Sequence, residues 1–250
     1  MPKKVLLLGG TGGCGKHALL SLLSSGASVT ALVRSSEKLT ACLDDIEASR
    51  QSPSKTSREL LTIVEFTEGH LSMYIKSHVA SCDAVVSCLG HNLSFKGLFR
   101  PPKRLCLDTS KIVFQSATKP IKLIVISTEG VDDPTGGDPP RAGLTERFVL
   151  WLLSYLLPPH ADNMENISFL HSEASVNPLV EICAVRPCDL LDAASPSEYG
   201  LAAALQSGIF GGRTTVRANV GDFMARLVTD GDVWEQWKGK FPHIWDVKKE

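Results

Sequence analysis

The feature that most constrains this chain is a glycine cluster that directly follows its first apolar run. Residues 5–16 read Val-Leu-Leu-Leu-Gly-Gly-Thr-Gly-Gly-Cys-Gly-Lys, and an apolar helical pattern begins at Ala18. This order predicts a strand, a glycine-rich turn and a helix at the start of the fold. In such a turn, backbone N–H groups can approach a phosphate, and the helix N-terminus adds a partial positive charge.

The spacing of the glycines allows three interpretations. Gly9, Gly12 and Gly15 form G-x-x-G-x-x-G, a dinucleotide-binding fingerprint. Residues 10–16 form G-x-x-x-x-G-K, a near P-loop, but a P-loop needs Ser or Thr next to hold Mg²⁺, and this chain has His17. A packing turn without a ligand is the third interpretation. We favour the dinucleotide-binding turn, which the rest of the chain must support.

Beyond this turn, apolar strand-like runs alternate with helical patterns. The later runs lie at residues 28–33, 61–66, 84–88, 121–126 and 180–185. The alternation predicts an α/β fold with a doubly wound parallel Rossmann sheet of order 3-2-1-4-5-6 and a cleft at the carboxyl ends of the strands. We expect a single domain over residues 1–250, with an insertion or lid at 131–175. A small C-terminal substrate-side segment at 187–215 is expected to carry a short strand pair.

Two other stretches carry expectations about exposure. Residues 45–60 are polar and rich in helix breakers, so we expect a surface loop there. Residues 148–157 are almost entirely apolar. Because a helix that is apolar on all sides is normally buried, we expect it to lie between the sheet and the lid. A subunit interface, as in a homodimer, and a membrane-surface patch are the alternatives for this helix.

Composition and charge narrow the classes of partner. The formal net charge is −1 and no basic stripe is evident, which argues against nucleic acid. No apolar stretch reaches the roughly 18–20 residues that span a bilayer. The seven cysteines form no C-x-x-C pair. We therefore expect a reducing, cytoplasmic location with neither a metal site nor a disulfide framework.

Residues at the ends of two strands bear on the choice of cofactor. Arg34 follows the second strand, where a dinucleotide fold meets the adenosine ribose. An acid there selects NAD, whereas a base pairs with the 2′-phosphate of NADP. Arg34, with Lys38 one helical turn later, predicts NADP(H), although Glu37 lies between them. Ser127-Thr128 ends the fifth strand, and hydroxyls at that edge face the nicotinamide region of a doubly wound sheet.

Taken in order, these motifs resemble those of the atypical short-chain dehydrogenase/reductases. The closest groups are the NmrA-like NAD(P)H-binding proteins and the biliverdin and flavin reductases. The resemblance implies NADP(H) as cofactor and a small-molecule acceptor, with Thr128 and Ser127 near the nicotinamide as candidate catalytic residues. It implies cofactor contacts from Gly9, Thr11, Gly12, Gly13, Cys14, Gly15, Arg34, Lys38, Leu89, Gly90, Ser127, Arg186 and Pro187.

The chain departs from the best-known branch of this superfamily, which uses a Tyr-x-x-x-Lys pair as its proton relay. Four residues after Tyr74, Tyr155 and Tyr199 come histidine, proline and alanine. We therefore expect an NADPH-dependent reductase of a small planar or unsaturated acceptor, quinone- or flavin-like, that works without this pair. The alternative from another class is a non-catalytic NADP(H)-binding redox sensor. A nucleotide-sugar isomerase or epimerase and a P-loop phosphotransferase are weaker alternatives.

Overall fold

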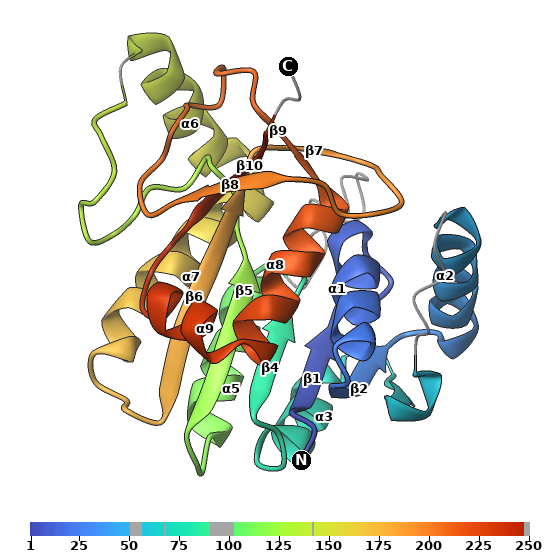
Figure 1. Ribbon diagram of the computed structural model, residues 1–250. Coiled ribbons are helices and arrows are strands. Elements are labelled where there is room, and N and C mark those ends of the chain that lie inside the picture. Colours follow the sequence, from blue (N-terminus) through green and yellow to red (C-terminus); the bar gives the residue numbers. More distant parts are fainter. Residues whose placement is uncertain (51–56, 68, 91–102, 142, 248–250) are drawn as a thin grey trace.

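The computed structural model describes residues 1–50, 57–67, 69–90, 103–141 and 143–247. Its centre is a sheet with the strand order β3-β2-β1-β4-β5-β6-β10-β8 (Figure 1). The first six of these strands are parallel and confirm the predicted order 3-2-1-4-5-6. They are β1 (Lys4–Leu8), β2 (Ser28–Val33), β3 (Leu61–Glu65), β4 (Ala84–Ser87), β5 (Ile121–Ile126) and β6 (Val180–Pro187).

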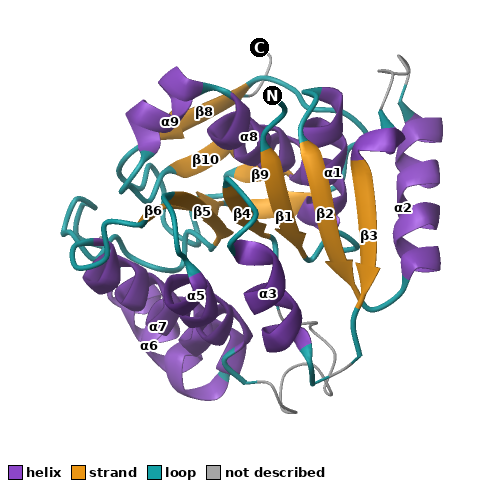
Figure 2. Cartoon of the chain, turned by 90° about the horizontal axis from the view of Figure 1, so that it is seen from below, coloured by secondary structure: helices purple, strands orange, loops and turns teal. Residues whose placement is uncertain are grey.

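Helices cover both faces of the sheet (Figure 2). One face carries α1 (Gly13–Ser24), α2 (Ser36–Ser49), α8 (Arg217–Thr229) and α9 (Gly231–Trp237). The other carries α3 (Leu71–Val79), α5 (Leu105–Ser116) and α7 (Pro158–Ala174), with α6 (Leu144–Leu156) outside α7. A 3-10 turn, Arg58–Leu60, precedes β3. The two faces make this a three-layer doubly wound fold.

Two apolar cores hold the layers together, and β1 shows how the sequence builds both. Val5 and Leu7 pack toward α1 and α8, whereas Leu6 and Leu8 pack toward α3, α5 and α7. Since successive side chains of a strand point to opposite faces, a strand covered on both sides must be apolar throughout. The continuous run 5–8 therefore predicts a central parallel strand, as found.

The C-terminal part of the chain extends this sheet in a way that the sequence pattern did not predict. Strand β10 (His243–Asp246) pairs in parallel with β6 and antiparallel with β8 (Tyr199–Ala202). A separate two-stranded parallel pair is formed by β7 (Asp189–Leu191) and β9 (Thr214–Val216), which lie in the segment 187–215 except for Val216. Runs of three or four residues carry little periodic signal, and pairing with distant strands decides their conformation.

The expectation that residues 148–157 are buried is wrong. The large apolar side chains that α6 leaves exposed are those of Leu144, Phe148, Trp151, Leu152, Tyr155 and Leu156. The helix is joined to α7 by a single residue and packs against it. Apolar composition predicts burial but cannot say how many neighbours a helix will have. In the described part of the chain, no helix combines the length and the apolarity needed to cross a membrane.

Part of the surface loop expected at 45–60 is helical, because α2 extends into it. The helix continues to Ser49, so the first residues of that range are helical. Ser35 caps its N-terminus by accepting a hydrogen bond from the Lys38 backbone N–H at 3.1 Å. Residues 51–56 of the expected loop lie outside the described residues.

Candidate functional site

The glycine turn connects β1 to α1 with almost no space between turn and helix. Gly9 has a φ of +78°, a conformation that favours glycine. A Cβ atom at Gly9 would lie 2.6 Å from the Cys88 carbonyl oxygen, and one at Gly15 would lie 2.1 Å from the Gly9 carbonyl oxygen. The Gly12 N–H donates to the same Gly9 oxygen at 2.9 Å. Close packing of helix, turn and β4 therefore requires glycine at positions 9 and 15.

Among the residues that the structure describes, no side chain caps the N-terminus of α1. Its N-cap is Gly12, and the first turn contains no acidic residue. The first N–H groups of a helix have no partner within the helix, and together they carry a partial positive charge. The turn thus presents uncapped donors at the carboxyl ends of β1 and β4, as an anion-binding turn requires.

Arg217, which the sequence analysis did not single out, lies over this turn. It is the first residue of α8, and a Cβ atom at Gly13 would lie 2.6 Å from its Cδ and 2.7 Å from its Nε. Its Nη1 forms an ion pair with Asp192 at 3.0 Å. A side chain at position 13 would collide with Arg217 where it now packs on Gly13. No local sequence signal could have revealed this contact, because the two residues are far apart in the chain.

Two cations lie at the carboxyl end of β2, where the sequence predicts the adenosine side of a cofactor. Arg34 and Lys38 are both exposed. Within the described residues, the Arg34 side chain forms no hydrogen bond or ion pair. The nearby Glu65 carboxylate is used by the Ser36 backbone N–H, which donates to it at 2.8 Å. Arg34 is therefore available to an anionic ligand.

The strands next to β1 bring the other predicted residues to the same edge of the sheet. Leu89 and Gly90 lie two and three residues after the end of β4, and Ser127 directly follows β5. The Ser127 side-chain oxygen is buried and has no hydrogen-bond partner in the described part of the molecule. The Thr128 side-chain oxygen, by contrast, accepts a hydrogen bond from the Gly130 N–H at 3.3 Å. Of the two hydroxyls, Ser127 is the one that lacks a partner.

Arg186 does not extend this edge as expected. Its side chain is 0% exposed, and it donates to the Phe241 carbonyl oxygen at 2.6 Å and to the Val131 carbonyl oxygen at 3.1 Å. It also forms a two-pronged ion pair with Asp138. All three guanidinium nitrogens are thus engaged inside the protein, whereas the expectation placed Arg186 against the cofactor. The sequence pattern of an arginine near the end of a buried strand, as Arg186 is in β6, is the same whether its side chain points inward or outward.

A buried cluster of Glu129, Cys188 and His243 offers three potential metal ligands within 4.8 Å of one another. The Gln206 backbone N–H donates to His243 Nδ1 at 3.1 Å, so the ring proton of the neutral imidazole lies on Nε2, 3.0 Å from the Cys188 sulfur. Burial, and then the Glu129 carboxylate, raise the pKa of the Cys188 thiol to about 12. Ser207 also donates to Glu129, at 3.2 Å.

A metal ion at this cluster would need the Nε2 lone pair and would move the ring proton to Nδ1. That proton would then face the Gln206 N–H, an unfavourable contact between two donors. The cluster is better explained as a hydrogen-bonded brace. It joins the segment after β5, the segment after β6, and strand β10.

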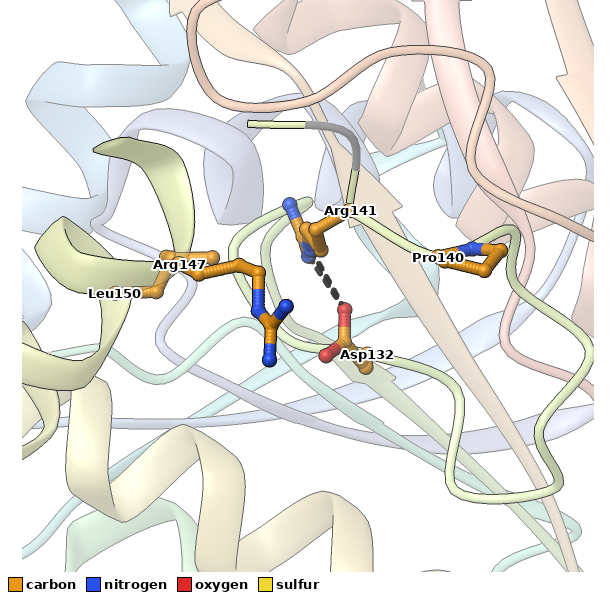
Figure 3. Close-up of a pocket in the computed structure, with 5 residues that line it drawn as sticks. All are labelled: Asp132, Pro140, Arg141, Arg147 and Leu150. Carbon is orange, nitrogen blue, oxygen red and sulfur yellow. Dashed lines mark hydrogen bonds and ion pairs between the residues drawn. The ribbon is translucent and has the colours of Figure 1, made fainter. Parts of the chain in front are cut away.

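A surface pocket of about 460 Å³ lies beside the segment that follows β5 (Figure 3). Its lining consists of Asp132, Pro140, Arg141, Arg147 and Leu150. Arg141 is paired with Asp132 at 2.7 Å and with Glu146 at 2.6 Å. None of the predicted cofactor residues lines this pocket, so it is separate from the edge described above.

His17, in the second turn of α1, is a buried titratable group. Its side chain is 2% exposed, and its Nδ1 has no hydrogen-bond partner within the described residues. Burial, together with the positive charges of Lys16 and Arg50, lowers the pKa of His17 to about 4. Folded His17 is therefore neutral at neutral pH.

We expect the free energy of unfolding to fall as the pH drops from about 6.5 to about 4. In that range the unfolded chain binds a proton at His17 and the folded chain does not, so up to about 3 kcal/mol of stability is lost. Urea unfolding at a series of pH values measures this slope. His17→Leu should flatten it, whereas His171→Gln, on the exposed side of α7, should not. Equal slopes in the wild type and His17→Leu would contradict this assignment.

Comparison with known proteins places this geometry in a family context. The model of the NAD(P)H-binding family matches residues 9–231. A search of curated proteins finds no significant match. Among solved structures, a candidate NAD-dependent epimerase/dehydratase from Bacillus halodurans is 18% identical, with 99% of this chain and 95% of that chain covered and a TM-score of 0.66.

Two further structures have similar coverage. A candidate NADH-flavin reductase from Streptococcus pneumoniae TIGR4 is 16% identical, with 98% of this chain and 100% of that chain covered and a TM-score of 0.63. ChuY, an anaerobilin reductase from Escherichia coli O157:H7, is 15% identical, with 99% and 100% covered and a TM-score of 0.59. At these identities, the likeness shows the shared fold.

Proposed function

The chain belongs to the NAD(P)H-binding family, and we propose that it is an NADPH-dependent reductase of a small planar or unsaturated acceptor, quinone- or flavin-like. The observation that carries the proposal is the edge formed by the glycine turn, Arg34 and the Ser127 hydroxyl, none of which has a side-chain partner among the described residues. Because the sheet order places β2, β1, β4 and β5 side by side, one extended ligand can reach all three.

The choice of NADPH over NADH rests on Arg34 and Lys38. The guanidinium of Arg34 can form paired, charge-assisted hydrogen bonds with a 2′-phosphate, and Lys38 adds a second positive charge one helical turn away. Glu37 and Glu65 lie nearby, but the Glu65 carboxylate is already bonded to the Ser36 N–H. In this proposal the remaining contacts come from the glycine turn (Gly9, Thr11, Gly12, Gly13, Cys14 and Gly15), from Leu89 and Gly90, and from the backbone of Pro187.

The proposed chemistry needs little more than orientation. When bound, NADPH would supply a hydride and become NADP⁺, and the one proton that completes the reduction would come from solvent. In our proposal, Ser127 donates a hydrogen bond to the acceptor or to the carboxamide of the cofactor, because its buried oxygen lacks a partner. Close, fixed approach of the acceptor then provides the rate enhancement.

The three tyrosines of the sequence support a mechanism without a tyrosine acid. The Tyr199 hydroxyl donates to Asp222 at 2.7 Å, and burial, together with that carboxylate, raises its pKa well above the usual range. Tyr155 of α6 is exposed to solvent. Tyr74 packs against Phe66 on the face of the sheet that α3, α5 and α7 cover. A proton from solvent replaces the relay in this account.

A non-catalytic NADP(H) sensor is the second candidate, and one observation favours it. The exposed apolar side of α6, with Phe148, Trp151 and Tyr155 in ring contact, is a surface that a partner protein could use to read cofactor occupancy. The same surface is where a homodimer would form. We propose a cytoplasmic location for either function, supported by the seven free cysteines.

Turnover separates the two candidates. The purified chain is mixed with NADPH and a panel of quinones and flavins, and loss of absorbance at the NADPH band is followed. If the protein is a reductase, NADPH oxidation should be faster with the protein than without it for at least one acceptor. Tight NADPH binding without turnover on any acceptor would instead support the sensor.

A further inference from the structure

The two most tightly packed helices of the fold bring their N-termini to the same place. Gly13 at the start of α1 lies under Arg217 at the start of α8. One turn further along, a Cβ atom at Gly221 of α8 would lie 2.5 Å from the Ala18 backbone nitrogen of α1. The helices therefore run parallel and side by side (Figure 1). Their arrangement places a guanidinium beside the uncapped end of α1.

The positive charge at this point has little compensation. The N-terminus of α8 also lacks a capping side chain and an acidic first turn, although Asp246 accepts a hydrogen bond from the N–H of its N-cap residue, Val216, at 2.8 Å. The N-terminus of α1 has neither a capping side chain nor an acidic first turn. Arg217 adds a full positive charge, and within the described residues its ion-pair partner is Asp192, whose side chain is 78% exposed. An ion pair with a carboxylate this exposed is weak, so another anion can replace Asp192.

We propose that Arg217 binds the pyrophosphate of the cofactor against the N-terminus of α1, and that Asp192 competes with this pyrophosphate for the Arg217 guanidinium. The inference rests on the proposed function, since the pyrophosphate belongs to the dinucleotide. Arg217 donates two charge-assisted hydrogen bonds to phosphate oxygens, whereas the exposed Asp192 offers a solvated carboxylate. Asp192 keeps the guanidinium in place over Gly13 until the cofactor arrives.

A purely structural role for the ion pair predicts something different. The pair would then tie the segment after β7 to the start of α8, and loss of either partner would weaken the site equally. If Asp192 competes with the pyrophosphate, loss of Arg217 should lower nucleotide affinity, whereas loss of the Asp192 charge should not lower it. That difference makes the proposal testable.

The test compares Arg217→Ala, Asp192→Asn and Arg226→Ala in fluorescence titrations with NADPH and with NADH. Arg217→Ala should weaken both nucleotides about tenfold or more, because both carry the pyrophosphate. Asp192→Asn should bind both equally well or about two- to fivefold more tightly. Arg226→Ala removes an arginine from the opposite end of α8 and should leave both affinities unchanged. Circular dichroism and thermal unfolding check that each variant is folded, and Arg217→Lys should retain part of the affinity.

Two results would overturn the inference. One is an Arg217→Ala variant that binds both nucleotides like the wild type. The other is an equal loss of affinity in Arg217→Ala and Asp192→Asn, which indicates a structural tie. In both cases wild-type binding stays intact and the proposed function stands. If the wild type binds neither nucleotide, the proposed function itself fails, and the inference fails with it.

Discussion

Replacing Gly15 with alanine should abolish measurable NADPH binding, with a loss of more than about 100-fold, and should lower the free energy of unfolding by about 2–3 kcal/mol. The added methyl group would lie 2.1 Å from the Gly9 carbonyl oxygen, which is a backbone atom and cannot rotate away. Either α1 or the turn must then move. Both movements shift the N–H groups that face the ligand.

The experiment pairs nucleotide titration with urea unfolding of the same variant. Gly231→Ala is the matched control, because Gly231 opens α9 and nothing lies within 4 Å of the Cβ that it would gain. That control should change neither NADPH affinity nor stability appreciably. A Gly15→Ala protein that binds NADPH like the wild type would show that the turn is not where the ligand binds.

Replacing Arg186 with methionine should destabilise the fold by about 3–5 kcal/mol. The substitution leaves the Asp138 carboxylate buried without its cation, and it also removes the donors to the Phe241 and Val131 carbonyls. The Arg186 guanidinium holds the pKa of Asp138 below its usual value despite its burial. The effect should therefore be on stability, and the preference for NADPH over NADH should not change.

Urea unfolding of Arg186→Met, Asp138→Asn and the double variant measures this effect. The double variant should be less destabilised than the sum of the single variants, because the second substitution removes the charge that the first leaves unpaired. Arg104→Met is the control, since the Arg104–Glu165 pair is exposed and should be worth less than about 1 kcal/mol. A destabilisation of Arg186→Met no larger than that of Arg104→Met would contradict the buried role assigned here.

The sequence predicts the six parallel strands well, and the physical reason is visible in β1, where residues 5–8 are all apolar and buried. A strand covered on both faces is mostly apolar, and such runs stand out between polar turns. The additions at the C-terminal end, β10 and β8, have no such pattern, because each is short and depends on its neighbours. Helix α6 shows the opposite failure, since a strong apolar pattern predicts burial where the helix packs against α7 and leaves many apolar side chains exposed.

The candidate site divides in the same way. The glycines at positions 9 and 15 can be predicted from the sequence, because a tight turn between a strand and a helix allows few backbone conformations. Arg34 is readable because the position after β2 is fixed by the topology. The contacts of Arg217 and Arg186 cannot be predicted from the sequence, because they depend on which distant residue each side chain meets. Sequence can place an arginine at a strand or helix end, but only the packed structure shows where its guanidinium goes.

The most direct test of the account is a fluorescence titration of the wild type and Arg34→Ala with NADPH and NADH. We expect the wild type to prefer NADPH, and Arg34→Ala to lose that preference, at a cost of about 1.5–3 kcal/mol or roughly tenfold or more in NADPH affinity. Arg147→Ala, which removes an exposed arginine away from the β2 edge, should keep the preference. Equal binding of both nucleotides by the wild type would contradict the role of Arg34. Binding of Mg-ATP, but of neither nucleotide, would contradict the whole account.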